Sequence, residues 1–170
     1  MELRLTREQI DVMSRHAEDA YPEECCGLIL GPPAGPPSNE AARNGREEVR
    51  LFPVRNVQNE YHERDPETYT RTARRAYLID PFEFERILGE AKESGEVLRG
   101  IFHSHPDEDA YFSQEDKDAA VPFGDIPSFP DAEHVVMSVR ERRVRDFKVF
   151  RWSTEEKDFA GGELAVDGEI

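Results

Sequence analysis

The chain has 170 residues, of which 35% are charged and 37% hydrophobic, and its formal net charge at pH 7 is −15. A chain of this length suits one domain that can bury a sizeable core. Its acidic character argues against sequence-independent binding to nucleic acid or to an anionic membrane, because both depend on clustered lysine and arginine. We therefore expect one catalytic or binding domain with no nucleic-acid or membrane partner.

The sequence also favours a cytoplasmic protein. The opening residues MELRLTREQI contain no apolar run typical of a signal peptide, and no segment approaches the ~20 apolar residues of a membrane span. Cys25 and Cys26 are the only cysteines and are adjacent, so a disulfide between them would close a strained ring. We therefore expect a reducing compartment and a cytoplasmic location.

Helix and strand patterns alternate in the first third of the chain. Thr6, with Gln9 three residues later, gives a capping box ahead of apolar positions at helical spacing, which predicts a helix over residues 7–20. The run CCGLILG (residues 25–31) predicts a short buried strand. A loop rich in proline, glycine and asparagine follows over residues 32–47, and EVRLFPVRN (residues 48–56) predicts a second strand.

The middle of the chain contains a less regular segment and then a well-marked helix. Residues 57–76 have no clear period, and we expect them to form an irregular flap with a short helical piece. Residues 77–79 predict a short strand. Asp80 as N-cap, Pro81 in the first turn and Gly95 after the last turn predict a helix between them, with apolar residues at helical spacing.

The last part of the chain predicts three strands and a helix. Residues 97–104 (VLRGIFHS) predict a strand, a helix is expected to begin at Ser113, and residues 134–152 predict two strands around a turn near 141–143. The residues after Trp152 are acidic, and we expect a flexible tail over 153–170 following a domain over 1–152.

The stretch GIFHSHPDEDAYFSQED (residues 100–116) has the chemistry of a metal site. Side chains two apart in a strand share a face, so His103 and His105 should converge, and Asp116 lies in the first turn of the following helix. Two imidazole nitrogens and one carboxylate oxygen form a set typical of catalytic zinc, with the fourth position left for water. Ser113 and Asp116 alone would more often be an N-cap and its partner, and a capped helix start can serve both purposes.

These motifs resemble a known family. His103-Ser104-His105-Pro106, followed after six residues by Ser113 and after two more by Asp116, resembles the signature of the JAMM, or MPN-plus, zinc metallopeptidases. YPEECCGLILG (residues 21–31) is similar to the segment that carries the glutamate of that family. The resemblance covers about residues 3–152 and is closest to the short bacterial branch, although Phe112 stands where many members have proline.

The resemblance implies the fold and the site. It implies a single α/β domain of three layers, with a curved, mixed and mostly antiparallel sheet and flanking helices, of the JAMM/MPN and cytidine-deaminase-like kind. It also implies a Zn²⁺ ion on His103, His105 and Asp116, with Glu24 as general acid/base and Ser113 as oxyanion stabiliser. These side chains would meet at the end of the strand that carries both histidines.

Other polar residues near these motifs have less specific expectations. Glu23 competes with Glu24, but alternation along the strand puts the two on opposite faces, and the resemblance selects Glu24. Ser104 is expected to hydrogen-bond locally. The remaining histidines have no partner at a ligand spacing and are expected to be structural or on the surface: His16, His62 and His134.

The function implied by the resemblance is zinc-dependent peptidase activity. Short bacterial relatives trim the C-terminus of ubiquitin-like sulfur-carrier proteins, so we expect cleavage after the C-terminal Gly-Gly of such a carrier. A deconjugating isopeptidase for a bacterial ubiquitin-like modifier is the alternative. Tyr111 and Phe112 would either form the wall of a narrow Gly-Gly channel or pack under the loop.

Two further classes compete with a zinc peptidase. A cysteine hydrolase would use Cys25 or Cys26, but the adjacent apolar run GLIL favours buried, inert thiols. A non-catalytic scaffold would resemble the MPN-minus relatives, which lack the ligands, whereas this chain has the complete set. Both alternatives make the metal content of the protein the informative measurement.

Overall fold

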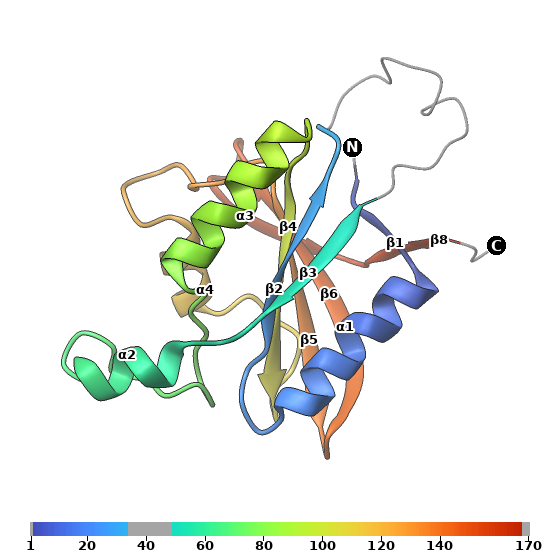
Figure 1. Cartoon of the computed structure of the whole chain (residues 1–170). Helices are drawn as coiled ribbons and strands as arrows, with labels where there is room; N and C mark the ends of the chain where they lie inside the picture. Colours follow the sequence, from blue (N-terminus) through green and yellow to red (C-terminus); the bar gives the residue numbers. More distant parts are fainter. Residues whose placement is uncertain (1, 34–48, 168–170) are drawn as a thin grey trace.

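The main sheet of this computed structural model, which describes residues 2–33 and 49–167, is mixed and mostly antiparallel (Figure 1). In chain order the elements are β1 (Arg4–Thr6), α1 (Arg7–Ala20), β2 (Cys26–Gly31), β3 (Arg50–Val54), α2 (Gln58–Arg64), α3 (Pro81–Glu93), β4 (Val97–Pro106), α4 (Gln114–Ala120), β5 (Glu133–Arg140), β6 (Arg143–Ser153), β7 (Asp158–Gly162) and β8 (Ala165–Asp167). In the described residues the sheet order is β3-β2-β4-β5-β6-β7, with only β4 and β5 parallel. The predicted mixed sheet is therefore confirmed.

Apolar side chains on the two faces of the sheet form separate cores, which gives the predicted three layers. On β2, Ile29 contributes to the core under α1, whereas Leu28 and Leu30 contribute to the core under α3. A strand buried on both faces reads as a continuous apolar run, which is the pattern of GLIL. The two flanking helices use the predicted positions, with Met13 and Ala17 buried on α1 and further buried residues on α3.

The β2–β4 pair is held close by one glycine. Gly27 lies opposite Phe102 in the antiparallel register. A Cβ atom at Gly27 would lie 2.1 Å from Phe102 Cζ and 2.8 Å from the backbone oxygen of Phe52. The position therefore excludes a side chain, and the ring of Phe102, which is fully buried, can lie across the strand.

The predicted helix ends are confirmed. The Thr6 side chain accepts from the Gln9 N–H and the Gln9 side chain accepts from the Thr6 N–H, which completes the capping box of α1. Asp80 accepts from two backbone N–H groups of α3, and Gly95 follows that helix with a φ of 75°. In the described part of the chain no helix is long and apolar enough to cross a membrane.

Two sequence expectations are wrong. Residues 77–79 form only an isolated bridge, Asn56 with Ile79, because the Leu78 N–H donates to the side chain of Asn56 and not to a strand. The expected flexible tail is ordered over residues 153–167, since β7 pairs with β6 and β8 pairs in parallel with β1. Phe159 stabilises this part of the chain by packing in the third apolar cluster.

The segment 57–76 contains the short helix that we expected, α2. In Figure 1, α2 projects to one side of the sheet at the end where β4 leads toward α4. The loop expected over residues 32–47 lies outside the described residues except for Pro32 and Pro33.

Candidate functional site

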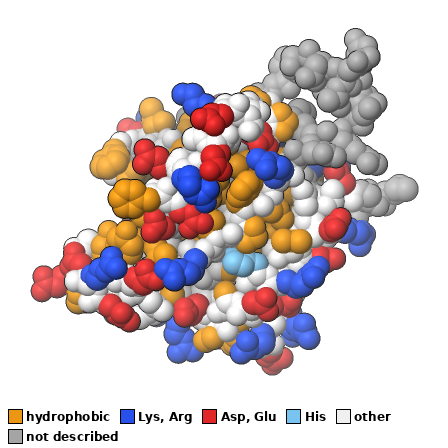
Figure 2. All heavy atoms as spheres, viewed as in Figure 1, with side chains coloured by type: hydrophobic (Ala, Val, Ile, Leu, Met, Phe, Trp, Pro, Cys, Tyr) orange, Lys and Arg blue, Asp and Glu red, His pale blue; other side chains and the backbone are white. Residues whose placement is uncertain are grey.

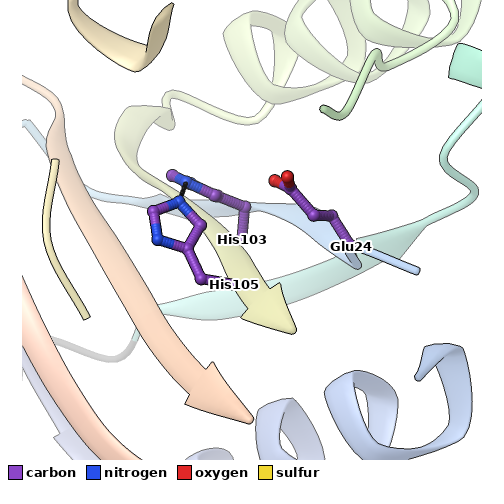
Figure 3. A group of neighbouring side chains, drawn as sticks. All are labelled: Glu24, His103 and His105. Atoms are coloured by element: carbon purple, nitrogen blue, oxygen red, sulfur yellow. Dashed lines mark hydrogen bonds between the residues drawn. The ribbon is translucent and has the colours of Figure 1, made fainter. Parts of the chain in front are cut away.

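Three predicted ligands converge at the end of β4. His103 Nε2 lies 3.1 Å from His105 Nε2 and 3.2 Å from Asp116 Oδ2, and His105 Nε2 lies 3.3 Å from the same carboxylate oxygen. The two imidazoles share a face of the strand because they are two residues apart. Figure 3 shows them side by side, with the carboxylate of Glu24 facing them from the neighbouring chain segment. The strand alternation predicted from the sequence is therefore confirmed.

Asp116 reaches the histidines because of the start of α4. Ser113 is the N-cap of α4, and its Oγ accepts from the Asp116 N–H at 3.1 Å. In return, Asp116 Oδ2 accepts from the Ser113 N–H at 3.0 Å. The capping box thus fixes the same oxygen that faces His103 and His105, and nearby histidines hold the pKa of Asp116 well below its usual range against the effect of burial.

A backbone hydrogen bond orients the ring of His105, and burial favours the neutral ring of His103 by lowering its pKa. His105 Nδ1 lies 3.2 Å from the backbone oxygen of Asp109, which requires the proton on Nδ1. Burial lowers the pKa of His103, whose ring stacks on Tyr77 with centroids 4.6 Å apart. Metal-ligating histidines are usually oriented by an outer hydrogen-bond partner. His105 has such a partner, whereas the buried Nδ1 atom of His103 has none among the described residues.

The donor set fits a tetrahedral cation such as zinc. Zinc bonds of about 2.0–2.2 Å in a tetrahedral arrangement place neighbouring ligand atoms about 3.3–3.6 Å apart. The spacings of 3.1, 3.2 and 3.3 Å among His103, His105 and Asp116 lie near the short end of that range. Asp116 Oδ2 and, with the proton on Nδ1, His105 Nε2 face this point with lone pairs, which suits a cation.

Glu24 is buried, and its carboxylate lies beside the ligand cluster. A carboxylate oxygen of Glu24 and ring nitrogens of His103 and His105 all lie within 4.8 Å of one another. Its backbone N–H donates to the Ala73 oxygen at 2.8 Å, and its backbone oxygen accepts from Asn56 Nδ2 at 2.9 Å. Burial, reinforced by the charge of Asp116, raises the pKa of Glu24 to about 9. The carboxyl is therefore positioned and tuned to hold a proton.

Glu23 lies apart from this cluster, although both glutamates precede β2 and the strand alternation expected for them does not apply. Its carboxylate oxygens both lie 3.4 Å from Asn59 Nδ2, and it is half-buried, not fully exposed as a solvent-facing residue would be.

A cavity of about 530 Å³ opens beside the cluster and is lined by Glu24, His105, Tyr111, Ser113 and Asp116 among others. The Ser113 hydroxyl accepts from the Asp116 N–H, so its own hydrogen remains available to a group in the cavity. Tyr111 is partly exposed at the cavity, whereas Phe112 is buried and stacks on Phe150. Of the two roles considered for these residues, Phe112 therefore takes the packing role.

The remaining residues singled out in the sequence lie outside the cluster. The buried Ser104 hydroxyl accepts from the Cys25 N–H at 2.8 Å, which confirms its local role and ties β4 to the segment before β2. Cys25 and Cys26 are buried free thiols. Three histidines do not join the described ligand group: His16 lies near backbone oxygens of β2 and β3, His62 lies on α2, and His134 is buried among aromatic rings.

The sequence analysis did not predict the basic wall of the cavity. Arg71, Arg74, Arg75 and Tyr77 line it, and all come from or follow the segment expected to be an irregular flap. The available signal was the run RTARR (residues 71–75), which places three arginines together in a strongly acidic chain.

Comparison with known proteins agrees with this fold. Residues 6–152 match the model of a family described as prokaryotic homologs of the JAB domain. The CysO-cysteine peptidases of Mycobacterium tuberculosis H37Rv and Mycobacterium bovis are each 28% identical to the chain over 142 residues, which is 84% of this chain and 77% of theirs.

Solved structures give the same fold. Protein DSY2949 from Desulfitobacterium hafniense has a TM-score of 0.66 at 24% identity and covers 98% of this chain and 94% of its own. A protein from Salinibacter ruber has a TM-score of 0.60 at 25% identity and covers 99% and 94%. AF2198, a JAB1/MPN domain protein from Archaeoglobus fulgidus, has a TM-score of 0.51 at 14% identity and covers 97% of each chain.

Proposed function

The chain belongs to the family of prokaryotic homologs of the JAB domain, and from this premise we propose that it is a zinc-dependent peptidase that cleaves after the C-terminal Gly-Gly of a ubiquitin-like sulfur-carrier protein. The observation that carries the proposal is the convergence of His103, His105 and Asp116 opposite the buried carboxyl of Glu24. The curated relatives support the choice of substrate, since they are named as peptidases that act on a CysO-cysteine species.

His103, His105 and Asp116 would hold the zinc ion, and the cavity leaves room for water and substrate beside them. When bound at such a site, zinc supplies Lewis acidity, which activates water at neutral pH and polarises a carbonyl group. The neutral state favoured for His103 and the ionised state favoured for Asp116 suit this role, because ligands bind metal in their deprotonated forms.

Glu24 is the proton carrier of the reaction. Its carboxylate accepts a proton from the attacking water and then delivers that proton to the amine that leaves. Without a metal, burial favours the protonated carboxyl, whereas the positive charge of a bound zinc ion would favour the carboxylate that accepts the first proton. Ser113, whose hydroxyl hydrogen is free to point into the cavity, donates to the carbonyl oxygen as negative charge develops on it.

The shape of the site suits an extended C-terminal tail. Glycine residues can pass close to Tyr111 at the cavity wall, and main-chain hydrogen bonds along a strand would hold the tail extended. A cytoplasmic location fits the two buried thiols, Cys25 and Cys26, because adjacent free cysteines are typical of a reducing compartment.

The test is a digest of a sulfur-carrier protein that has residues appended after Gly-Gly, with the same carrier changed to Val-Val as the control. We expect the zinc-loaded protein to release the appended residues only from the Gly-Gly carrier, as read by mass spectrometry. Equal cleavage of both carriers, or cleavage only of unrelated unstructured peptides, would contradict the proposed substrate. Cleavage only of a lysine-linked conjugate would assign the deconjugating isopeptidase alternative instead.

A further inference from the structure

The cavity has a basic wall beside Glu24. Arg71, Arg74 and Arg75 line it, although the chain carries a net charge of −15. On the face shown in Figure 2, basic side chains are interspersed with acidic ones. Locally positive regions can therefore occur despite the negative net charge. Three arginines in one short segment at a cavity wall therefore require an explanation within the site.

This segment is fixed to the backbone that carries Glu24. The Ala73 oxygen accepts from the Glu24 N–H at 2.8 Å, and the Ala73 N–H donates to Asn59 Oδ1 at 2.7 Å. The Arg71 oxygen accepts from Gln58 Nε2 at 2.9 Å. Side-chain amides from the start of α2 thus replace the hydrogen bonds of a regular ladder, and they hold the arginines next to the general base.

A third side-chain amide connects the far end of the same segment. Asn56 Nδ2 donates to the backbone oxygens of both Glu24 and Ala76, at 2.9 and 3.0 Å. The arginine side chains therefore extend from a segment attached at both ends to the rest of the site, and this reduces the entropy lost when they bind a ligand.

The acidic groups of the cavity have partners of their own. Glu115 pairs with Arg71 at 2.5 Å, Asp107 accepts from the Tyr21 hydroxyl at 2.9 Å, and Glu108 accepts from the Tyr111 hydroxyl at 3.0 Å. Arg75 lies 4.0 Å from Glu108 and is largely exposed.

Arg74 and Arg75 are consequently the arginines with capacity for a ligand. Among the described residues, Arg74 forms no salt bridge within 4.0 Å, and the contact of Arg75 is long. The positive charges of Arg71 and Arg75 oppose the rise in the pKa of Glu24, which places both within electrostatic reach of that carboxyl.

We propose that Arg74 and Arg75, supported by Arg71, bind the free α-carboxylate of the residue released from the carrier. This inference rests on the proposed peptidase function and specifies the leaving-group side of the substrate. Water adds to the glycine carbonyl carbon, the C–N bond breaks, and the amine accepts the proton held by Glu24. In a single released residue the α-carboxylate is attached to the same carbon as that amine, so it must lie close to Glu24, where the arginines are.

The chemistry of arginine suits this ligand. Its planar guanidinium matches a carboxylate in a bidentate arrangement and stays charged at all physiological pH values. A site of this kind selects carriers with one residue after Gly-Gly over longer extensions, because a longer extension moves the carboxylate away and puts an uncharged peptide group in its place.

The experiment compares two carriers that differ only at the terminus: one ends in Gly-Gly-Ala with a free carboxylate and the other in Gly-Gly-Ala with a carboxamide. We expect the wild-type enzyme to favour the acid by about tenfold or more in kcat/KM, the effect typical of a charge-assisted hydrogen bond. The double variant Arg74→Gln, Arg75→Gln should bring this ratio close to one, and the Lys pair at the same positions should retain part of it. Arg64→Gln, an exposed arginine at the end of α2, is the matched control and should keep the wild-type ratio.

A binding measurement separates this inference from the peptidase proposal. The Glu24→Gln variant should bind the acid carrier about tenfold more tightly than the amide carrier without cleaving either. If the wild type cleaves neither carrier, the peptidase proposal fails, and the binding ratio still decides the arginine site. Equal cleavage or equal binding of acid and amide, retention of the ratio in the Gln pair, or absence of binding to both carriers would overturn the arginine site.

Discussion

Ser113 and Asp116 cap each other across the first turn of α4, and the carboxylate oxygen of this pair is also the one that faces the histidines. Asp116 Oδ2 accepts from the Ser113 N–H at 3.0 Å and lies 3.2 Å from His103 Nε2. One hydrogen-bonded turn therefore performs a structural and a functional task. Because the backbone of the turn fixes the carboxylate, the ligand is in place before any ion binds.

A comparison of two caps separates these tasks. Ser113→Ala should lower the free energy of unfolding by about 1 kcal/mol, as should Thr6→Ala, which removes the equivalent cap of α1 far from the cavity. Only Ser113→Ala should also reduce carrier hydrolysis, by about 10²-fold, because it removes the oxyanion donor. Urea denaturation and kinetics on the same preparations measure both effects. Equal loss of activity in the two variants would mean that Ser113 acts through helix stability alone.

The ligand set predicts the metal content. The isolated protein should contain about one zinc per chain, as expected for a site with a single tetrahedral ligand set. His103→Ala, His105→Ala and Asp116→Ala should each remove most of the zinc, since each deletes one of three converging donors. His62→Ala, on α2 outside the cluster, should leave the zinc in place. Elemental analysis that finds equal zinc in all variants would refute the assignment.

The two adjacent glutamates provide an internal control for the proton carrier. Glu24→Gln should retain the metal and the fold but lower hydrolysis by about 10²–10⁴-fold, because an amide cannot accept the proton of water. Glu23→Gln should leave the rate almost unchanged, since the Glu23 carboxylate lies 3.4 Å from the Asn59 amide and outside the described ligand group. Kinetic constants and zinc content of both variants make the measurement. A reversal of the two effects would show that Glu23 carries the proton.

Local patterns in the sequence predicted the site better than its surroundings. The His103–His105 alternation and the Ser113 cap depend on neighbours along the chain, so period and capping rules predict them. The arginine wall depends on amides of Asn56, Gln58 and Asn59 that bond to residues 13 to 20 positions away, and also to Glu24. Such contacts produce no periodic pattern in the sequence, so the segment was predicted to be irregular.

The end of the chain illustrates a second limit of prediction from the sequence. Its acidic composition indicated a flexible tail, yet Phe159 is buried on β7 and contacts Trp152 with ring centroids 5.2 Å apart. Composition averages over the segment, whereas one aromatic residue at the correct register is enough to attach it to β6. Several of the strands were predictable because they have apolar runs bounded by turn residues, whereas the mixed order of the sheet was implied by the family resemblance.

The cysteine-hydrolase alternative makes an opposite chemical prediction. Burial raises the pKa of Cys25 to about 12 and also raises the pKa of Cys26, so neither thiol ionises near neutral pH. Iodoacetamide at pH 7.5 should therefore leave hydrolysis unchanged, whereas a chelator that removes the metal should abolish it. Cys25→Ala should behave as the wild type toward both reagents. Inactivation by iodoacetamide with resistance to chelation would restore the thiol mechanism.

The pH dependence of stability should be traceable to His134. Burial lowers the pKa of His134 to about 4, although the negative charge of Asp116 opposes this effect. Its ring lies among those of Phe112 and Phe159, and its Nδ1 atom has no hydrogen-bond partner among the described residues. The fold therefore favours the neutral imidazole and gives the charged form no compensation.

The sign of the effect follows from the direction of this shift. In the unfolded chain His134 binds its proton near the ordinary histidine pKa of about 6.5, and in the fold only near 4. Its neutral form is thus fully compatible with the fold above about pH 6.5, and stability is lost as the pH falls from about 6.5 toward 4. Between pH 7 and pH 4.5 this one group should cost on the order of 2 kcal/mol.

His134→Leu should remove that part of the acid sensitivity. We expect its loss of unfolding free energy between pH 7 and pH 4.5 to be smaller than that of the wild type by on the order of 2 kcal/mol. At pH 7 the variant should be close to the wild type, because no hydrogen bond of Nδ1 is lost. The measurement is urea denaturation of chelator-treated protein, which removes the separate effect of metal release in acid. Val136→Ala, in the same apolar cluster but without a titratable group, should lower stability equally at both pH values. If His134→Leu and the wild type lose the same free energy in acid, the acid sensitivity comes from other groups.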